Sequence, residues 1–346
     1  LIISKFNFIS FLKNMNLNFL RSKSILVTGG TGSFGVNFTE FLLKKSKNID
    51  RIAIYSRDEL KQSQLQLKFK KNKKLRFFIG DIRDKQRLIY ALEDIDYVIH
   101  AAALKQVPTA EYNPLEAIKT NVLGAQNLIE ACLQTNVKKV IALSSDKAVA
   151  PINLYGATKL CSDKLFIASN NYIGKKNISF SVIRYGNVMG SRGSVLPIFL
   201  NQKKSGIVTL THKDMTRFNI LMEDCIKMVI WSLKNAHGGE IFVPKIPSFR
   251  IKDLAKVVTP ECKVKYIGIR SGEKIHEEMI TANESQDIID IGKYYVLLPS
   301  KNFVKGNKYS KFERIKYGFS YSSDKNKDFL NLTDLKKLVK KYMKRY

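Results

Sequence analysis

The stretch SILVTGGTGSFG, residues 24–35, decides the fold of this chain. Its first five residues predict a buried strand, and Gly29, Gly32 and Gly35 then follow in a Gly-x-x-Gly-x-x-Gly pattern. Glycine permits a tight turn and lets backbone N–H groups approach a pyrophosphate at a helix N-terminus, and we expect that helix over residues 36–44. A glycine triplet alone is weak, but between a strand and a helix it predicts dinucleotide binding.

Further apolar runs follow, and helix-sized segments separate most of them. They lie at residues 51–55, 75–79, 97–101, 140–143 and 180–184. Runs that are apolar throughout are typical of parallel strands covered by helices on both faces. The alternation therefore predicts an α/β fold, a Rossmann-type doubly wound parallel sheet. A smaller C-terminal lobe is expected from about Gly186, where Gly and Pro interrupt shorter segments.

These patterns divide the 346 residues into three parts. Residues 24–185 are expected to form the cofactor-binding Rossmann domain, completed by a segment at about 220–245. Residues 186–346 are expected to form mainly the substrate-binding lobe. Residues 1–23 are an N-terminal extension, and we expect the part before Met15 to be an upstream extension of the reading frame.

Charge is the unusual feature of the composition. The chain has 59 Lys and Arg against 30 Asp and Glu, a formal net charge of +29, which by itself suggests nucleic acid or an anionic membrane. However, only 13 of the 59 are Arg, the residue whose planar fork suits phosphates, and the other 46 are Lys. We therefore interpret the excess as compositional bias and expect no nucleic-acid or membrane partner.

The cysteines and the hydropathy indicate the compartment. Cys132, Cys161, Cys225 and Cys262 lie far apart and form no Cys/His cluster, which predicts neither a disulfide scaffold nor a metal site. The chain has no run of 18 apolar residues, so its sequence predicts no membrane-spanning helix. A reducing cytoplasm fits both observations.

The turn after the second strand indicates which dinucleotide binds. NAD sites usually carry a carboxylate there for the ribose 2′-hydroxyl, whereas this chain places Ser56 and Arg57 in the turn and Lys61 one helical turn later. Arg57 suits a 2′-phosphate and favours NADP. The alternative is that Arg57 is solvated and Asp58 holds the ribose of NAD. Further cofactor contacts are expected at Thr28, Ser33, Phe34, Asp81, Ile82, Ala101 and Ala102.

Ser145, Tyr155 and Lys159 form a candidate catalytic set. Tyr155 and Lys159 are four residues apart and share one helix face. Tyrosine is a poor base at neutral pH, and a lysine cation beside it favours the phenolate. Ser145, at a strand end, can orient a substrate hydroxyl. The spacing is that of the short-chain dehydrogenases and reductases.

Asp146 and Lys147 follow Ser145 directly. A plain oxidoreductase needs no acid–base pair there. A dehydratase does, because one group must remove a carbon-bound proton while another protonates the departing hydroxyl. The alternative is that Asp146 and Lys147 form an ordinary surface dipeptide.

Long motifs now point to one family. The chain resembles the inverting UDP-N-acetylglucosamine 4,6-dehydratases of pseudaminic acid biosynthesis, which are extended short-chain dehydrogenases, over roughly residues 24–335. The resemblance is carried by TGGTGSFG (28–35), YSRDELKQ (55–62), HAAALKQVP (100–108), EYNPLEAIKTNVLG (111–124), ALSSDKAVAPINLYGATKL (142–160), RYGNVMGSRGSVLPIF (184–199), RSGEKIHEEM (270–279) and FSYSSDKNKDFL (319–330).

The resemblance implies a lyase with tightly bound NADP that is recycled in each turnover. It implies that Tyr155 with Lys159 deprotonates the 4-hydroxyl, that Lys147 removes the carbon-5 proton, and that Asp146 protonates the leaving 6-hydroxyl. The product would be UDP-2-acetamido-2,6-dideoxy-β-L-arabino-hexos-4-ulose, a precursor for flagellin or surface glycans. It also implies substrate or cofactor contacts at Lys105 and substrate contacts at Asn187, Arg192, Arg217, Arg270 and Glu273.

Other interpretations remain open. Related dehydratase–epimerases make N-acetylfucosamine-type precursors, but they typically have Met where this chain has Tyr155. A UDP-sugar 4-epimerase would need no proton exchange at carbon 5. A non-catalytic Rossmann protein that binds an anionic partner is a third possibility, motivated by the net charge. The family also implies a homo-oligomer, a dimer or a hexamer.

Overall fold

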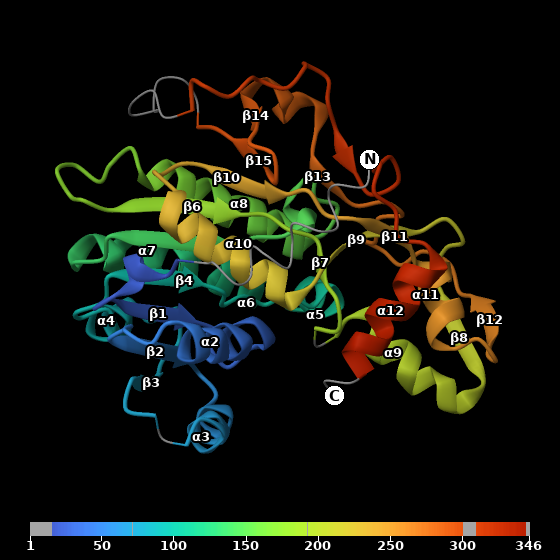
Figure 1. Cartoon of the computed structure of the whole chain (residues 1–346), viewed down its shortest axis with the longest axis horizontal. Coiled ribbons are helices and arrows are strands. Elements are labelled where there is room, and N and C mark those ends of the chain that lie inside the picture. Colours follow the sequence, from blue (N-terminus) through green and yellow to red (C-terminus); the bar gives the residue numbers. More distant parts are fainter. Residues whose placement is uncertain (1–15, 71, 192, 300–308, 344–346) are drawn as a thin grey trace.

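The main sheet forms the centre of the molecule. The computed structural model describes residues 16–70, 72–191, 193–299 and 309–343 of the 346. In this part of the chain the largest sheet has nine strands in the order β14-β15-β10-β6-β5-β4-β1-β2-β3 (Figure 1). The strands are β1 (Ser24–Thr28), β2 (Arg51–Ser56), β3 (Leu75–Ile79), β4 (Tyr97–His100), β5 (Lys139–Leu143), β6 (Ser179–Ile183), β10 (Ile241–Pro244), β14 (Ile288–Asp290) and β15 (Tyr294–Leu297).

The sheet confirms the predicted doubly wound fold. All the pairings from β3 across to β10 are parallel, and β1 to β6 are in the order of a Rossmann sheet. Each predicted strand is present to within one residue at either end. The first helix, α2 (Ser33–Lys45), begins three residues earlier than predicted because Gly32 is extended and caps it. The sequence did not reveal that β15 and β14 continue the sheet antiparallel to β10.

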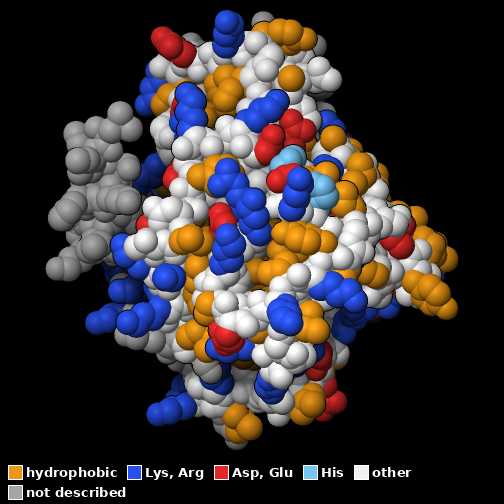
Figure 2. Space-filling model, turned by 90° about the vertical axis from the view of Figure 1, so that its right-hand side faces the viewer, with side chains coloured by type: hydrophobic (Ala, Val, Ile, Leu, Met, Phe, Trp, Pro, Cys, Tyr) orange, Lys and Arg blue, Asp and Glu red, His pale blue; other side chains and the backbone are white. Residues whose placement is uncertain are grey.

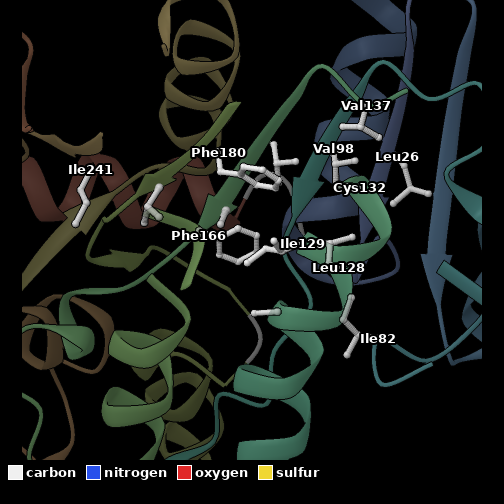
Figure 3. Packing of buried hydrophobic residues seen from close by; sticks show 14 of the residues in the cluster. Leu26, Ile82, Val98, Leu128, Ile129, Cys132, Val137, Phe166, Phe180 and Ile241 are labelled. Carbon is white, nitrogen blue, oxygen red and sulfur yellow. The ribbon is translucent and has the colours of Figure 1, made fainter. Parts of the chain in front are cut away.

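Helices cover both faces of this sheet. On one face α4 (Lys85–Ala91), α7 (Gly124–Gln134) and α8 (Leu154–Ser169) pack against one set of strand residues, and on the other α2 and α10 (Met222–Asn235) pack against the alternate set. Figure 3 shows the first set, in which Leu26 and Phe180 of the strands lie in one core with Leu128 and Phe166 of the helices. Period-two alternation along buried strands therefore fills two cores at once.

Shorter elements build the second lobe, at the right of Figure 1, and connect it to the sheet. A core that includes Leu196, Phe199, Leu254 and Leu335 holds its helices together. The strands are β7 (Asn187–Val188), β8 (Ile207–Leu210), β9 (Thr216–Ile220), β11 (Ser248–Arg250), β12 (Lys263–Tyr266), β13 (Glu278–Ile280) and β16 (Tyr321–Ser322). The remaining helices and short turns are η1 (Asn18–Leu20), α3 (Glu59–Lys68), α5 (Val107–Tyr112), α6 (Pro114–Ile118), η2 (Lys119–Leu123), η3 (Asp146–Ala148), α9 (Val195–Gln202), η4 (Lys203–Ser205), α11 (Ile251–Val258), η5 (Ala282–Asp287) and α12 (Leu332–Met343). Of these, α9, α11 and α12 share the core of the second lobe.

The basic side chains are spread over the surface that Figure 2 shows. Lys and Arg are interleaved there with acidic and apolar side chains instead of forming one continuous stripe. A nucleic-acid groove would concentrate them along one track. Among the described helices, none combines the length and the apolar character needed to cross a membrane.

The core around Phe166 provides a test of the packing. Phe166 is fully buried, and its ring lies 5.3 Å from His100 and 6.3 Å from Phe180. We expect Phe166→Ala to lower the free energy of unfolding by about 3–5 kcal/mol, because the lost contacts leave a cavity. Denaturant unfolding measures this, with the exposed Tyr90→Ala, expected within about 0.5 kcal/mol of wild type, as control. Equal midpoints for the two variants would contradict the packing described.

Candidate active site

A cavity of about 570 Å³ opens at the carboxyl ends of the parallel strands, where ligands bind in sheets of this kind. Residues that follow β1, β2, β4 and β5 line it together with residues between 185 and 194. It therefore brings together segments from both lobes. The predicted site residues that line it are Gly29, Gly32, Ser33, Phe34, Gly35, Ser56, Arg57, Lys61, Ile82, Ala101, Ala102, Lys105, Ser145, Asp146, Lys147, Tyr155, Lys159 and Asn187.

The glycine loop leaves room for a phosphate close to the backbone. Gly29 has a φ of +64°, and a Cβ on it would lie 2.9 Å from the carbonyl oxygen of Ala101. A Cβ on Gly35 would lie 2.4 Å from the carbonyl oxygen of Gly30. Gly32 caps α2 with no side chain to satisfy the first N–H groups of the helix. These N–H groups and the helix dipole favour an anion, so the cradle fits the pyrophosphate of a dinucleotide.

The turn after β2 brings Arg57, Asp58 and Lys61 to the cavity, and the Asp58 carboxylate also caps the next helix. The Asp58 side chain caps α3 by accepting the backbone N–H of Lys61 at 2.9 Å, and it also pairs with the Lys61 ammonium. Arg57 is half exposed and lies 3.5 Å from Asp81. Burial would raise the pKa of Asp81, but hydrogen bonds from Arg83 and the charge of Arg57 lower it. Asp81 does not itself line the cavity.

Thr28 lies beneath the cavity and fixes the segment after β4. Its Oγ1 lies 2.8 Å from Nδ1 of His100 and accepts the backbone N–H groups of Ala101 and Ala102 at 3.2 and 3.3 Å. Thr28 is fully buried and does not line the cavity, whereas Ala101 and Ala102, which it holds, do. Burial and the charge of Lys159 lower the pKa of His100 to about 3.

The two candidate catalytic pairs meet because α8 packs directly on the turn after β5. A Cβ on Gly156 would lie 2.2 Å from the carbonyl oxygen of Lys147, so only glycine permits this approach. The Ser145 hydroxyl accepts the backbone N–H of Lys147 at 3.3 Å and donates to Oδ1 of Asp146 at 2.9 Å. Tyr155 and Lys159, on the same helix as Gly156, line the same cavity.

The pKa of Tyr155 differs from the sequence expectation. Burial raises it, while the charge of Lys147 and a hydrogen bond from Ser145 lower it by less. The charge of Lys147 therefore favours the phenolate, the effect that the sequence predicted for Lys159. Burial lowers the pKa of Lys159, and the charge of Asp163 opposes that. Asp163 in turn accepts a hydrogen bond from Ser144 at 2.6 Å.

Lys147 lies between two buried carboxylates. Its Nζ is 3.1 Å from Oδ1 of Asp146 and 3.0 Å from Oε1 of Glu277. Burial would lower the pKa of Lys147, but the charges of Asp146 and Glu277 raise it. Burial raises the pKa of Asp146. Glu277 lies in the motif RSGEKIHEEM but was not predicted as a site residue, because nothing local in the sequence connects that motif to Lys147.

The predicted substrate contacts divide into two groups. Lys105 and Asn187 line the cavity. Burial and the charge of Lys147 lower the pKa of Lys105. Oδ1 of Asn187 is buried without a hydrogen-bond partner in the described residues, as expected of a group that meets a ligand.

The other four predicted contacts do not line the cavity or cannot be placed. The Arg217 guanidinium is buried and donates to backbone carbonyls, so it is not available to a diphosphate. Arg270 is exposed, and Glu273 is half-buried and 3.8 Å from Arg217. Arg192 lies outside the described residues.

Other residues that line the cavity were not predicted as site residues. These are Thr31, Tyr55, Gly80, Ala103, Gln106, Thr120, Leu143, Ser144, Tyr185, Gly186, Val188, Ser191, Gly193, Ser194 and Met222. All except Gly80 and Met222 lie within the motifs quoted above, which is the signal that could have found them.

Comparisons with known proteins agree with this geometry. The family described as polysaccharide biosynthesis protein matches residues 25–299. The chain is 54% identical over 313 residues to UDP-N-acetylglucosamine 4,6-dehydratase (inverting) of Campylobacter jejuni, covering 88% of this chain and 93% of the relative. It is 42% identical over 331 residues to UDP-glucose 4-epimerase of Rickettsia bellii, covering 92% and 95% respectively.

A solved structure has the same fold over nearly the whole chain. The crystal structure of Pen from Bacillus thuringiensis superposes with a TM-score of 0.87 at 36% identity, covering 94% of this chain and 99% of that one. The Rossmann sheet and the second lobe are therefore a shared architecture.

The buried His100 predicts a dependence of stability on pH. The folded protein keeps His100 neutral down to about pH 3, whereas the unfolded chain binds a proton below its ordinary pKa of 6.5. Acid therefore favours unfolding, and this residue removes about 1.4 kcal/mol of stability for each pH unit below 6.5. Denaturant unfolding at pH 7 and pH 5 measures the loss, and His100→Asn should lose correspondingly less. The same loss in both proteins would contradict the assignment.

Proposed function

The chain belongs to the polysaccharide biosynthesis protein family, and on that premise we propose that it is an inverting UDP-N-acetylglucosamine 4,6-dehydratase, a hydro-lyase. The observation that carries the proposal is one cavity lined by two pairs, Tyr155 with Lys159 and Asp146 with Lys147. Hydride transfer at a carbinol needs only the first pair, whereas elimination of water also needs an acid and a base. The name of the Campylobacter relative supports the substrate.

The cofactor that the cavity fits is a nicotinamide dinucleotide, and we propose NADP. The glycine cradle at the start of α2 would hold the pyrophosphate, and Arg57 would pair with the 2′-phosphate. Asp58 is used as a helix cap, which disfavours the NAD alternative. Held in this cradle, the cofactor would supply the redox chemistry, acceptance of a hydride from carbon 4 of the sugar and its return to carbon 6.

The first proton transfer falls to Tyr155. Its phenolic oxygen takes the proton of the 4-hydroxyl, and loss of the carbon-4 hydride to the nicotinamide would complete the oxidation to a 4-keto group. Burial opposes the phenolate, and therefore the charge of Lys147 and the hydrogen bond from Ser145 are needed to favour it. Lys159, on the same helix and lining the same cavity, supports Tyr155 from the cofactor side.

The elimination then falls to Lys147 and Asp146. The 4-keto group acidifies carbon 5, and Lys147 takes that proton as a neutral amine, after its ammonium proton has passed to Oδ1 of Asp146, 3.1 Å away. Asp146 gives its proton to the 6-hydroxyl, which leaves as water, and the raised pKa of its buried carboxyl suits a proton donor. Oδ2 of Asp146 is buried and has no partner among the described residues. Return of a proton to carbon 5 from the opposite face gives the L-configured product.

Lys105 and Asn187 are proposed to contact the sugar, since both line the cavity. Arg192, Arg270 and Glu273 remain proposed contacts of the uridine diphosphate. We further propose that the product serves pseudaminic acid synthesis in the cytoplasm and that the enzyme is a homo-oligomer.

The second candidate function is a UDP-sugar 4-epimerase. The Rickettsia relative named UDP-glucose 4-epimerase favours it, because Tyr155 and Lys159 suffice for that chemistry. The epimerase reaction gives Asp146 and Lys147 no role, so we prefer the dehydratase.

Product analysis in heavy water separates the two functions. With UDP-N-acetylglucosamine as substrate, we expect NMR to show a 4-keto-6-deoxy sugar that carries deuterium at carbon 5, because Lys147 exchanges that position with solvent. An epimerised sugar with hydrogen retained at carbon 5 would overturn the dehydratase and support the epimerase.

Arg57 provides a test of cofactor choice. We expect Arg57→Ala to raise the Kd for NADP by about 10- to 100-fold, because one charge-assisted contact to the 2′-phosphate is lost, and to change NAD binding little. Titration calorimetry measures both. Arg87→Ala is the matched control, since that guanidinium donates to the carbonyl of Ile79 and does not line the cavity. Equal weakening of NADP and NAD would contradict the assignment of Arg57.

A further inference from the structure

Glu277 is a buried carboxylate of the second lobe that contacts a candidate catalytic residue of the Rossmann domain. Its Oε1 lies 3.0 Å from Nζ of Lys147, and its exposed fraction is 2%. No proton transfer in the proposed reaction requires Glu277 itself. A buried charge is costly unless it is paired, so its presence needs an explanation.

The backbone around Glu277 is fixed from both sides. Its N–H donates to Oγ of Ser323 at 2.9 Å, and the N–H of Ser323 donates to the Glu277 carbonyl at 2.8 Å. These bonds continue the pairing of β13 with β16, in which Glu278 is opposite Ser322. Glu277 is therefore held in place independently of Lys147.

Arg217 fixes the carboxylate from a third direction. Its Nε is 3.7 Å from the same Oε1, and its guanidinium donates to the carbonyls of Thr216, Ile275 and Lys274 at 2.7 to 3.0 Å. With these donors committed to backbone, Arg217 cannot swing toward a ligand. Arg217 therefore holds the Glu277 carboxylate in place beside Lys147.

The charges assign different tasks to the two carboxylates beside Lys147. Burial would raise the pKa of Glu277, but the charges of Lys147 and Arg217 lower it. Burial raises the pKa of Asp146, and Lys147 offsets this only in part. Glu277 therefore stays ionised, whereas Asp146 is the carboxyl that can be protonated.

We propose that Glu277 is the positioning residue for Lys147: it holds the amine toward the cavity and stabilises the ammonium formed when Lys147 takes the carbon-5 proton. The inference rests on the proposed dehydration. In that step the ammonium proton of Lys147 has already passed to Asp146, the carbon–hydrogen bond breaks, its electron pair passes into the enolate of the 4-keto sugar, and the proton bonds to the lone pair of the neutral Nζ. The negative charge of Glu277 makes the amine a stronger base, as the third group of a catalytic triad does for its histidine.

The test is Glu277→Gln in the full chain, with UDP-N-acetylglucosamine and NADP. We expect deuterium uptake at carbon 5 to slow by about 100-fold, because the base is misplaced and weakened. Oxidation at carbon 4 should persist, so the absorbance of reduced cofactor should build up. The pH profile of carbon-5 exchange should shift to lower pH by about one to three units, since loss of a nearby anion lowers the proton affinity of Lys147.

Two further variants make the result interpretable. Glu278→Gln is the matched control one residue along, half-buried and outside the cavity lining, and it should behave as wild type. Glu277→Asp keeps the charge one methylene farther away, so exchange should be partly restored with a pH profile close to wild type. If Glu277→Gln does not fold, the exchange rate and pH profile of Glu277→Asp alone test the role of Glu277.

The outcomes separate the two proposals. A wild-type protein that neither dehydrates the sugar nor exchanges carbon 5 overturns the proposed function. If the wild type is active, the inference on Glu277 is overturned by an unshifted pH profile in Glu277→Gln. It is equally overturned if that variant loses oxidation and exchange to the same extent, because that result indicates a general structural role.

Discussion

The site depends on a close contact between two pieces of backbone, Gly156 on α8 and the carbonyl of Lys147. A Cβ would lie 2.2 Å from that oxygen, so the contact exists only because residue 156 is glycine. It sets the first turn of α8, and with it Tyr155, against the turn that carries Asp146 and Lys147. The pair for oxidation and the pair for elimination thereby open onto one cavity. The parallel sheet places the cavity at the carboxyl ends of its strands, and the contact at Gly156 brings the two pairs of side chains together there.

Bringing these groups together concentrates buried charge, and the structure pairs each charge. Lys147 lies between Asp146 and Glu277, and Arg217 backs Glu277. On the cofactor side, Asp163 is the opposite charge that acts on Lys159, and Ser144 donates to Asp163. Buried ions of this kind add little to stability, because desolvation offsets their attraction. Their arrangement is therefore better explained by the chemistry at the cavity than by the stability of the fold.

Features that are set by residues close together in the chain could be predicted from the sequence, whereas features that depend on tertiary packing could not. The strands β1 to β6 and the glycine loop follow from local patterns and were predicted to within a few residues, whereas β10, β14 and β15 were not predicted. Ser145 to Lys159 were grouped because they are close in the chain. Glu277 was not, since 130 residues separate it from Lys147 and only tertiary packing joins them. The direction of the Tyr155 pKa was also missed, because burial cannot be read from spacing.

The boundary between the two lobes does not separate two independent modules. The chain enters the second lobe after β6, yet β10, β15 and β14 return to the main sheet, and Glu277 comes from the segment between them. A recombination event that exchanged everything after residue 186 between diverged relatives would replace three strands of the sheet together with the carboxylate at Lys147. New substrate preferences in this architecture are therefore expected to arise by point substitution around the cavity and not by exchange of whole lobes.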